Sequence, residues 1–482
     1  MNVKTFLRNN WSILIVLILT PVLLHVVLPI LPTHDDWAGT TKPDFNPFFI
    51  KERFLFYGYH WRPFDAIIGY IVGQNPQQLY PTFNHCVVVI GHAVCTYFVF
   101  KLLTILGYSP LARNLSALLF FILPATMATV TAIDSMNQVY ALTCGIISFM
   151  IYLARYTGHH TPYTSYFAWA AMLFIAAWWK ENGLMWAFIC PILAFGFNFI
   201  DRQQLKKDMI IAMAMIAVYA MAIFLLPKDI IIHPEYEPGM MKVVKNGVKF
   251  LFTTFITIDY VWLLHQPSRN LWAALLTFLP TIPLFYFIFI KNIRWFFNKK
   301  MLSVVLCLLI AVAPHIGTVF SMMHTYAGLA MLAVIVAYSI DRYKQPLKHI
   351  AMPFILFCLA CLFIDAHLVQ RSVESGLIGK RMAQEAIRQT DTPVDSVYVV
   401  IIEDDYPKLS SFCVIPNDAF GWGLAARYET NYQWPKVIED TTIERTTDYI
   451  QQAEAVASEK LSHHLFDCVW IVDHDKLKII KP

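Results

Sequence analysis

The sequence contains few charged residues. Only 15% of its 482 residues are Asp, Glu, Lys or Arg, whereas 57% are hydrophobic and 15% are aromatic. An average soluble domain has about a quarter charged residues. The shortage excludes a soluble enzyme, a disordered chain and a protein that wraps nucleic acid. A soluble chain of this length would form about three domains, so here we expect one large membrane domain and one small domain.

Cysteine is also scarce, because nine residues in a chain of this length imply no disulfide framework. Cys358 and Cys361 form a CxxC pair within an apolar stretch, and with no second pair we interpret them as packing residues. Cys413 and Cys468 are the two cysteines of the polar C-terminal tail. They could form a disulfide if the tail is periplasmic.

The charge that is present divides the chain into two parts. Residues 1–369 carry 25 Lys and Arg against 15 Asp and Glu, and residues 370–482 carry 12 against 18. The first part therefore has a net charge of +10 and the second of −6. Because the basic part is the apolar part, its cations should serve membrane topology or anionic lipid groups rather than nucleic acid.

Apolar runs close to the ~20 residues that a bilayer requires recur along the first part. The first run is too long for a signal peptide and lacks a small-residue cleavage site. The sequence therefore predicts a mainly α, polytopic transmembrane helical bundle of eleven spans, at 11–31, 84–106, 112–132, 136–154, 163–179, 183–200, 208–226, 272–290, 301–320, 325–340 and 351–369.

The segment 247–265 could either cross the membrane or lie at its surface. If it crosses, 9 cations of the membrane domain lie inside and 16 outside; if it does not, the numbers are 15 and 10. The positive-inside rule favours the second arrangement. It gives a cytoplasmic N-terminus, an outer loop at 32–82, an interfacial segment at 228–270 and an outer C-terminal domain.

The tail, residues 370–482, has the length of one small α/β domain. Its patterns predict helices near 371–389 and 441–460 and strands at 394–405, 466–473 and 476–480.

The segment after the first span carries the strongest chemical pattern. Asp35 and Asp36 lie directly outside the membrane, where carboxylates are costly unless they are solvated or used. The loop that follows interleaves cations with aromatic side chains, a combination that suits a ligand with a phosphate head, a sugar and an apolar tail. The cations and aromatics of interest are Lys42, Arg62, Trp37, Tyr57, His60 and Trp61.

An aspartate pair after the first span, followed by a short loop that ends in Arg-Pro, resembles the GT-C superfamily of polytopic glycosyltransferases. Three further stretches are similar to that family. One is the outer loop after the seventh span, PKDIIIHPEYEPG (227–239), which leads into an interfacial helix. LPATMATVTAIDSMNQVYAL (123–142) resembles the junction of its third and fourth spans, with Asp134 as the acidic residue. FIAAWWKENGLMW (174–186) resembles its Lys-Glu hairpin, here Lys180 and Glu181.

Size and layout look most like the bacterial and phage glucosyltransferases that modify O-antigen and convert the serotype of lipopolysaccharide. The resemblance implies an inverting hexosyltransferase of the bacterial inner membrane. It would move a sugar, glucose by this resemblance, from a polyprenyl-phosphate donor (undecaprenyl-phosphate glucose) to a polysaccharide or glycolipid acceptor on the periplasmic side. A flippase and a donor-lipid synthase would be its partners. No cofactor is implied; the loop after Asp36 lacks a metal-binding DxD motif, and a divalent metal stays an open question.

Transfer of a sugar to a hydroxyl needs a base for the acceptor proton and positive charge at the leaving phosphate. We expect Asp35 or Asp36 to be the base. The expected phosphate ligands are Arg62, Lys180, Lys42 and Lys245. The expected sugar or acceptor contacts are Trp37, Tyr57, His60, Trp61, Asp134 and Glu181.

Structural roles are the alternative for several of these residues. Arg62 could anchor the helix end at the lipid headgroups, Lys180 could pair with Glu181, and Asp134 could cap a helix. A transporter or flippase for a lipid-linked saccharide, or a polymerase or ligase, are the alternative functions. Ionisable residues collect at the outer edge rather than in mid-span, which favours the enzyme.

Overall fold

The computed structural model describes most of the chain. The described residues are 3–33, 36, 62–133, 135–156, 162–224, 239–255, 278–279, 281–286, 290, 293–317, 320–343, 348–403, 419–431 and 433–482. The predicted span at 272–290 lies mostly outside them.

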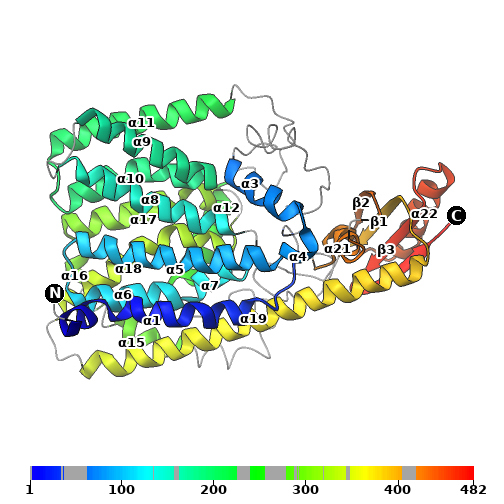
Figure 1. The fold of residues 1–482 in the computed structure, drawn as a ribbon, viewed down its shortest axis with the longest axis horizontal. Coiled ribbons are helices and arrows are strands. Elements are labelled where there is room, and N and C mark those ends of the chain that lie inside the picture. The colour runs from blue at the N-terminus through cyan, green and yellow to red at the C-terminus, as the bar shows by residue number, and fades with distance from the viewer. Residues whose placement is uncertain are drawn as a thin grey trace.

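A helical bundle forms the larger part of the fold (Figure 1). Its long helices are α1 (Val3–Val27), α5 (Thr82–Ile105), α6 (Pro110–Ile122), α8 (Met136–Ala154), α9 (Pro162–Trp179), α10 (Trp186–Gly196), α11 (Arg202–Phe224), α17 (Lys299–Ile316), α18 (Tyr326–Arg342) and α19 (Lys348–Thr390). Shorter helical elements are α3 (Pro63–Gly73), α4 (Pro76–Leu79), α7 (Pro124–Val130), η2 (Glu181–Met185), α12 (Met240–Phe255), α15 (Thr281–Phe285), α16 (Ile293–Phe296) and η5 (Met322–Thr325).

The bundle is that of a multi-pass membrane protein. Within the described residues six helices are long and apolar enough to cross a membrane, or seven if the bent pair α6 and α7 forms one span. The 49° bend falls at Leu123, which is extended because Pro124 follows it. The N-terminus and the C-terminal domain lie at opposite ends of the bundle (Figure 1), as an odd number of crossings requires. The eleven crossings themselves stay a prediction.

The C-terminal domain is an α/β unit, as predicted. Its strands are β1 (Ser396–Ile402), β2 (Val437–Ile443), β3 (Cys468–Asp473) and β4 (Lys476–Ile480), in the order β2-β1-β3-β4. β1 pairs in parallel with β2 and β3, and β4 is antiparallel to β3. The prediction of a helix from 441 is wrong, because β2 runs to Ile443 and the helix α22 spans Tyr449–Ser462.

Alternation along β1 builds a core on both faces of this sheet. Val397, Val399 and Ile401 pack with residues of α19 and of α21 (Leu424–Glu429). The intervening side chains of β1 pack against α22. Helix α19 therefore belongs to both parts of the fold: the predicted division at 369/370 falls inside this one helix of 43 residues.

At the end of the bundle away from the C-terminal domain, a buried carboxylate joins three helices. Asp208 of α11 has no exposed surface and accepts the hydroxyls of Tyr152 at 2.5 Å, Tyr156 at 2.8 Å and Tyr166 at 2.8 Å. The Arg155 guanidinium lies 3.6 Å from the Asp208 carboxylate and 3.4 Å from the Tyr166 ring centroid. These contacts connect α8, α9 and α11.

Asp208→Asn should lower the free energy of unfolding by about 3–5 kcal/mol, because it leaves the buried Arg155 without an opposite charge. The apparent melting temperature of the purified protein in detergent measures this loss. Asp201→Asn is the matched control: Asp201 accepts the Gln204 amide at 2.8 Å at the start of α11, and Asn caps a helix equally well. Equal melting temperatures for the two variants would contradict the prediction.

Candidate functional site

Asp36 lies in a tight turn beyond α1. Its Oδ2 accepts the Thr33 amide at 2.9 Å, and its own amide donates to the Thr33 carbonyl at 3.0 Å. The side chain is only 4% exposed. The start of α5 fixes this turn, since Tyr80 donates its hydroxyl to the Asp36 carbonyl at 2.7 Å and His85 Nε2 lies 3.0 Å from the Ile30 carbonyl.

Several predicted site residues lie outside the described residues, and the roles expected for them stay predictions. They are Asp35, Trp37, Lys42, Tyr57, His60, Trp61 and Asp134. Cys413 also lies outside, whereas Cys468 is buried in β3, so their disulfide stays a prediction as well.

Arg62 and Glu181 form a two-point ion pair. Arg62 precedes Pro63, the first residue of α3, and its Nε and Nη2 donate to the two Glu181 oxygens at 2.9 and 2.8 Å. The side chains are 16% and 32% exposed. Burial disfavours a charged guanidinium, but the neighbouring Glu181 carboxylate outweighs this cost and raises the pKa of Arg62 above its ordinary value. The ion pair thus connects the start of α3 to η2. The sequence offers Lys180 as a partner of Glu181, whereas this pair is formed with Arg62.

Lys180 lies directly before Glu181. It is extended at the start of η2 and only 7% exposed. Lys180, Glu181 and Arg62 all lie within electrostatic range of His315, the penultimate residue of α17. The structure therefore brings Arg62, Lys180 and Glu181 to one place, the end of the bundle that faces the C-terminal domain, which we call the domain end.

A neutral polar cluster adjoins these charges, and the sequence interpretation missed it. The Asn182 amide nitrogen lies 3.1 Å from His315 Nε2 and donates to Gln138 Oε1 at 3.4 Å. The His315 ring stacks on His324 with centroids 4.1 Å apart. The sequence could have indicated this cluster, because Gln138 and Asn182 are polar residues in apolar stretches close to Asp134 and Glu181, which are predicted to contact the sugar or acceptor.

Two polar atoms in this cluster, and one on the neighbouring residue Asn137, lack hydrogen-bond partners within the described structure. They are Asn182 Oδ1, Gln138 Nε2 and Asn137 Oδ1. The three residues are at most 7% exposed. An unsatisfied buried group costs about 1–3 kcal/mol, so a molecule that donates and accepts hydrogen bonds there would remove this cost.

Lys245 lies on α12, beside the cluster but directed to the surface. α12 packs on the end of α17, where the Asn246 side chain donates to the Ile316 carbonyl at 3.0 Å. Lys245 is exposed, and so are apolar residues of the same helix, Met241, Val244, Val248 and Leu251. This arrangement is typical of a helix at a membrane surface.

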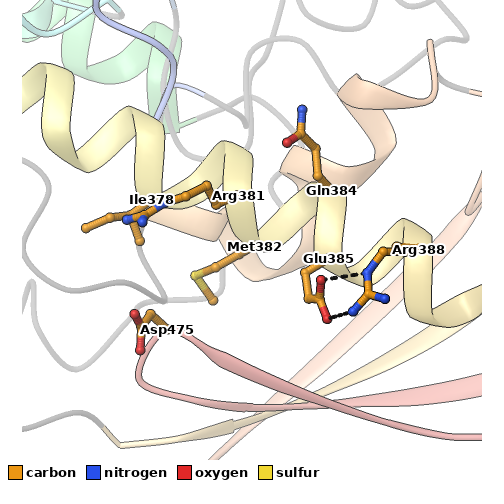
Figure 2. A pocket seen from close by; sticks show the side chains of 7 residues that line it. All are labelled: Ile378, Arg381, Met382, Gln384, Glu385, Arg388 and Asp475. Carbon is orange, nitrogen blue, oxygen red and sulfur yellow. Dashed lines mark hydrogen bonds and ion pairs between the residues drawn. The ribbon is translucent and has the colours of Figure 1, made fainter.

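A concavity of about 500 Å³ lies on the part of α19 that belongs to the C-terminal domain. Figure 2 shows Asp475 of the β3–β4 turn facing this helix and Glu385 bound to Arg388. It contains no predicted site residue. Its lining consists of Ile378, Arg381, Met382, Gln384, Glu385, Arg388 and Asp475.

No group of three or more His, Cys, Asp or Glu side chains in the described part of the chain is arranged to hold a metal ion. The domain end, as far as it is described, offers hydrogen bonds and fixed charges.

Comparison with known proteins gives little. The sequence matches no protein-family profile and no curated protein. The fold is similar to the crystal structure of the Archaeoglobus fulgidus oligosaccharyltransferase in its apo form, with a TM-score of 0.46, 13% identity and coverage of 86% of this chain. The chain spans 64% of the length of that protein, which is less than two thirds. A likeness of this size identifies neither family nor activity.

A double-mutant cycle of Arg62→Lys and Glu181→Gln should give a coupling energy of about 1.5–3 kcal/mol, because Lys cannot reproduce the two-point contact. Apparent melting temperatures of the four proteins measure it. The same cycle on Arg388 and Glu385, an exposed pair of the same chemistry, should show no measurable coupling. Equal coupling energies in the two cycles would contradict the prediction that the partly buried Arg62–Glu181 pair is stronger than an exposed pair.

Proposed function

We propose that this chain is a membrane glycosyltransferase of the GT-C type, which moves a sugar from a polyprenyl-phosphate donor to a saccharide acceptor. The observation that carries the proposal is the adjacency of two cations and a neutral polar cluster at the domain end. Arg62 and Lys180 suit a phosphate, and Gln138, Asn182 and His315 suit a sugar.

The charged part would bind the donor phosphate. The two-point contact with Glu181 fixes the plane of the Arg62 guanidinium, so its remaining N–H groups have a defined direction. Lys180 adds a second cation in a buried position, where an opposite charge is worth more than in water. Together they would neutralise the polyprenyl phosphate as it leaves.

The neutral part would bind the sugar. A sugar hydroxyl both donates and accepts a hydrogen bond, so one hydroxyl could donate to Asn182 Oδ1 and accept from Gln138 Nε2. The stacked His315 and His324 rings offer a flat wall beside these amides.

Asp36, or its neighbour Asp35, would take the proton of the acceptor hydroxyl. Direct displacement by that hydroxyl inverts the anomeric centre. In the finer form of the proposal the sugar is glucose, the donor is undecaprenyl-phosphate glucose, the acceptor is O-antigen on the periplasmic side, and a flippase and a donor-lipid synthase supply the donor.

Replacing Asp35 and Asp36 together with Asn should lower transfer by about 10²–10⁴-fold, because the base is lost. The measurement is the transfer of labelled sugar from polyprenyl-phosphate glucose in membrane vesicles, together with the sugar composition of the surface polysaccharide with and without the gene. Asp391→Asn, at an exposed left-handed position that Asn tolerates, is the control. Full transfer by the double variant at normal expression would overturn the proposal.

One observation favours the alternative of a transporter or flippase. Asp365 in α19 is 5% exposed, and neither carboxylate oxygen has a hydrogen-bond partner within the described residues. Buried carboxylates of this kind occur on ion and substrate pathways in membranes. A polymerase or ligase is the other alternative, and the labelled acceptor product separates it from a glucosyltransferase.

Asp365→Asn distinguishes transporter from enzyme. If the chain is a transferase, we expect transfer from donor added on the active side to stay within about twofold of the unmodified protein, because the Asp365 carboxylate forms no hydrogen bond with any described residue. If the chain is a flippase, the variant should abolish movement of a labelled polyprenyl-linked sugar across vesicles. Loss of lipid movement in a chain that shows no transfer would replace the proposed function.

A further inference from the structure

Two tyrosines connect the C-terminal domain to the Asp36 turn. The Tyr428 hydroxyl of α21 donates to the Tyr80 carbonyl at 2.9 Å, and the Tyr80 hydroxyl donates to the Asp36 carbonyl at 2.7 Å. The two rings meet edge to face with centroids 6.3 Å apart. Tyr80 is only 3% exposed, so this chain of hydrogen bonds is shielded from water where it reaches Asp36.

A small apolar cluster surrounds these tyrosines. Its buried members are Val72, Tyr80 and Ile133, and Tyr428 packs against them. Val72 is the penultimate residue of α3, the helix that Arg62 precedes, and Ile133 directly precedes Asp134. The C-terminal domain therefore contacts the Asp36 turn, the residue before Asp134, and the end of α3 that lies opposite to Arg62.

Two glycines of α19 bring the same domain close to α1. A Cβ atom on Gly376 would lie 2.7 Å from Leu31 Cβ and 3.0 Å from the Leu31 backbone, and one on Gly379 would lie 2.1 Å from the Ala419 carbonyl oxygen. Only glycine permits such approaches without movement of the neighbour. Because the two positions are less than one helical turn apart, α19 touches the segment that follows α1 and the segment that precedes α21 at nearly one level.

We propose that the C-terminal domain positions Asp36 for catalysis, and that Tyr428 is the positioning residue through which it acts. This inference rests on the proposed function. The base must lie within hydrogen-bond reach of the acceptor hydroxyl, and a displacement of about 1 Å can cost up to about 100-fold in rate. Hydrogen bonds to the backbone of the turn restrict such displacement. Tyr428 itself acts on Tyr80 rather than on substrate.

Tyr428→Phe and Tyr80→Phe in the full-length protein test the proposal, because each removes one hydroxyl and keeps the ring. Each should lower kcat by about tenfold while the donor KM changes less than about twofold. The kcat of the double variant should be no lower than that of the more impaired single variant, since both changes act on one turn. Tyr108→Phe is the matched control: Tyr108 is also buried, and its hydroxyl has no hydrogen-bond partner in the described part of the chain.

Hydrogen–deuterium exchange of the segment 28–36 supplies a readout that needs no activity. Tyr428→Phe should speed exchange at the Asp36 amide, and Tyr108→Phe should not. A lower melting temperature with unchanged kcat and unchanged exchange would overturn the positioning role and leave the proposed function intact. If the unmodified protein shows no transfer, the proposed function fails, and the exchange result alone decides whether the domain orders the turn. If Tyr428→Phe does not fold, Tyr80→Phe decides both readouts.

Discussion

A bundle with an apolar outer surface has to satisfy its polar groups from within, and this constraint organises the structure. Away from the C-terminal domain the Asp208 carboxylate accepts three tyrosine hydroxyls, although Arg155 beside it keeps one nitrogen without a partner among the described residues. At the domain end Gln138 and Asn182 each use one side of their amide and leave the other. What distinguishes these two amides is their position next to the Arg62–Glu181 pair.

The break between α9 and the 3₁₀ element η2 places adjacent residues in different surroundings. Lys180 is the extended residue before η2 and is 7% exposed. Glu181, the first residue of η2, forms the ion pair with Arg62 at the start of α3. Two consecutive positions of the chain thus supply a buried cation and one member of an ion pair.

The sequence predicted the bundle and the α/β tail well, because both depend on the hydrophobic pattern. It placed α8 at its observed bounds, and it missed β2 because an exposed edge strand with Glu439, Asp440 and two threonines lacks an apolar run. The partners of Glu181 and His315 could not be read from the sequence. Arg62 lies 119 positions from Glu181, and periodicity carries no information about contacts at such separations. The same holds for Tyr428, which has no feature of its own in the sequence.

Helix α19 has a further consequence for how this chain can vary. Its 43 residues span about 65 Å, roughly twice the hydrocarbon thickness of a bilayer, without a break. A continuous helix transmits angle as well as distance. One residue inserted into the helix between Gly376 and Thr390 would turn the sheet by about 100° and raise it by about 1.5 Å. Insertions in this part of α19 therefore have to preserve the helical phase, whereas the connection from Thr390 to β1 does not transmit such a rotation.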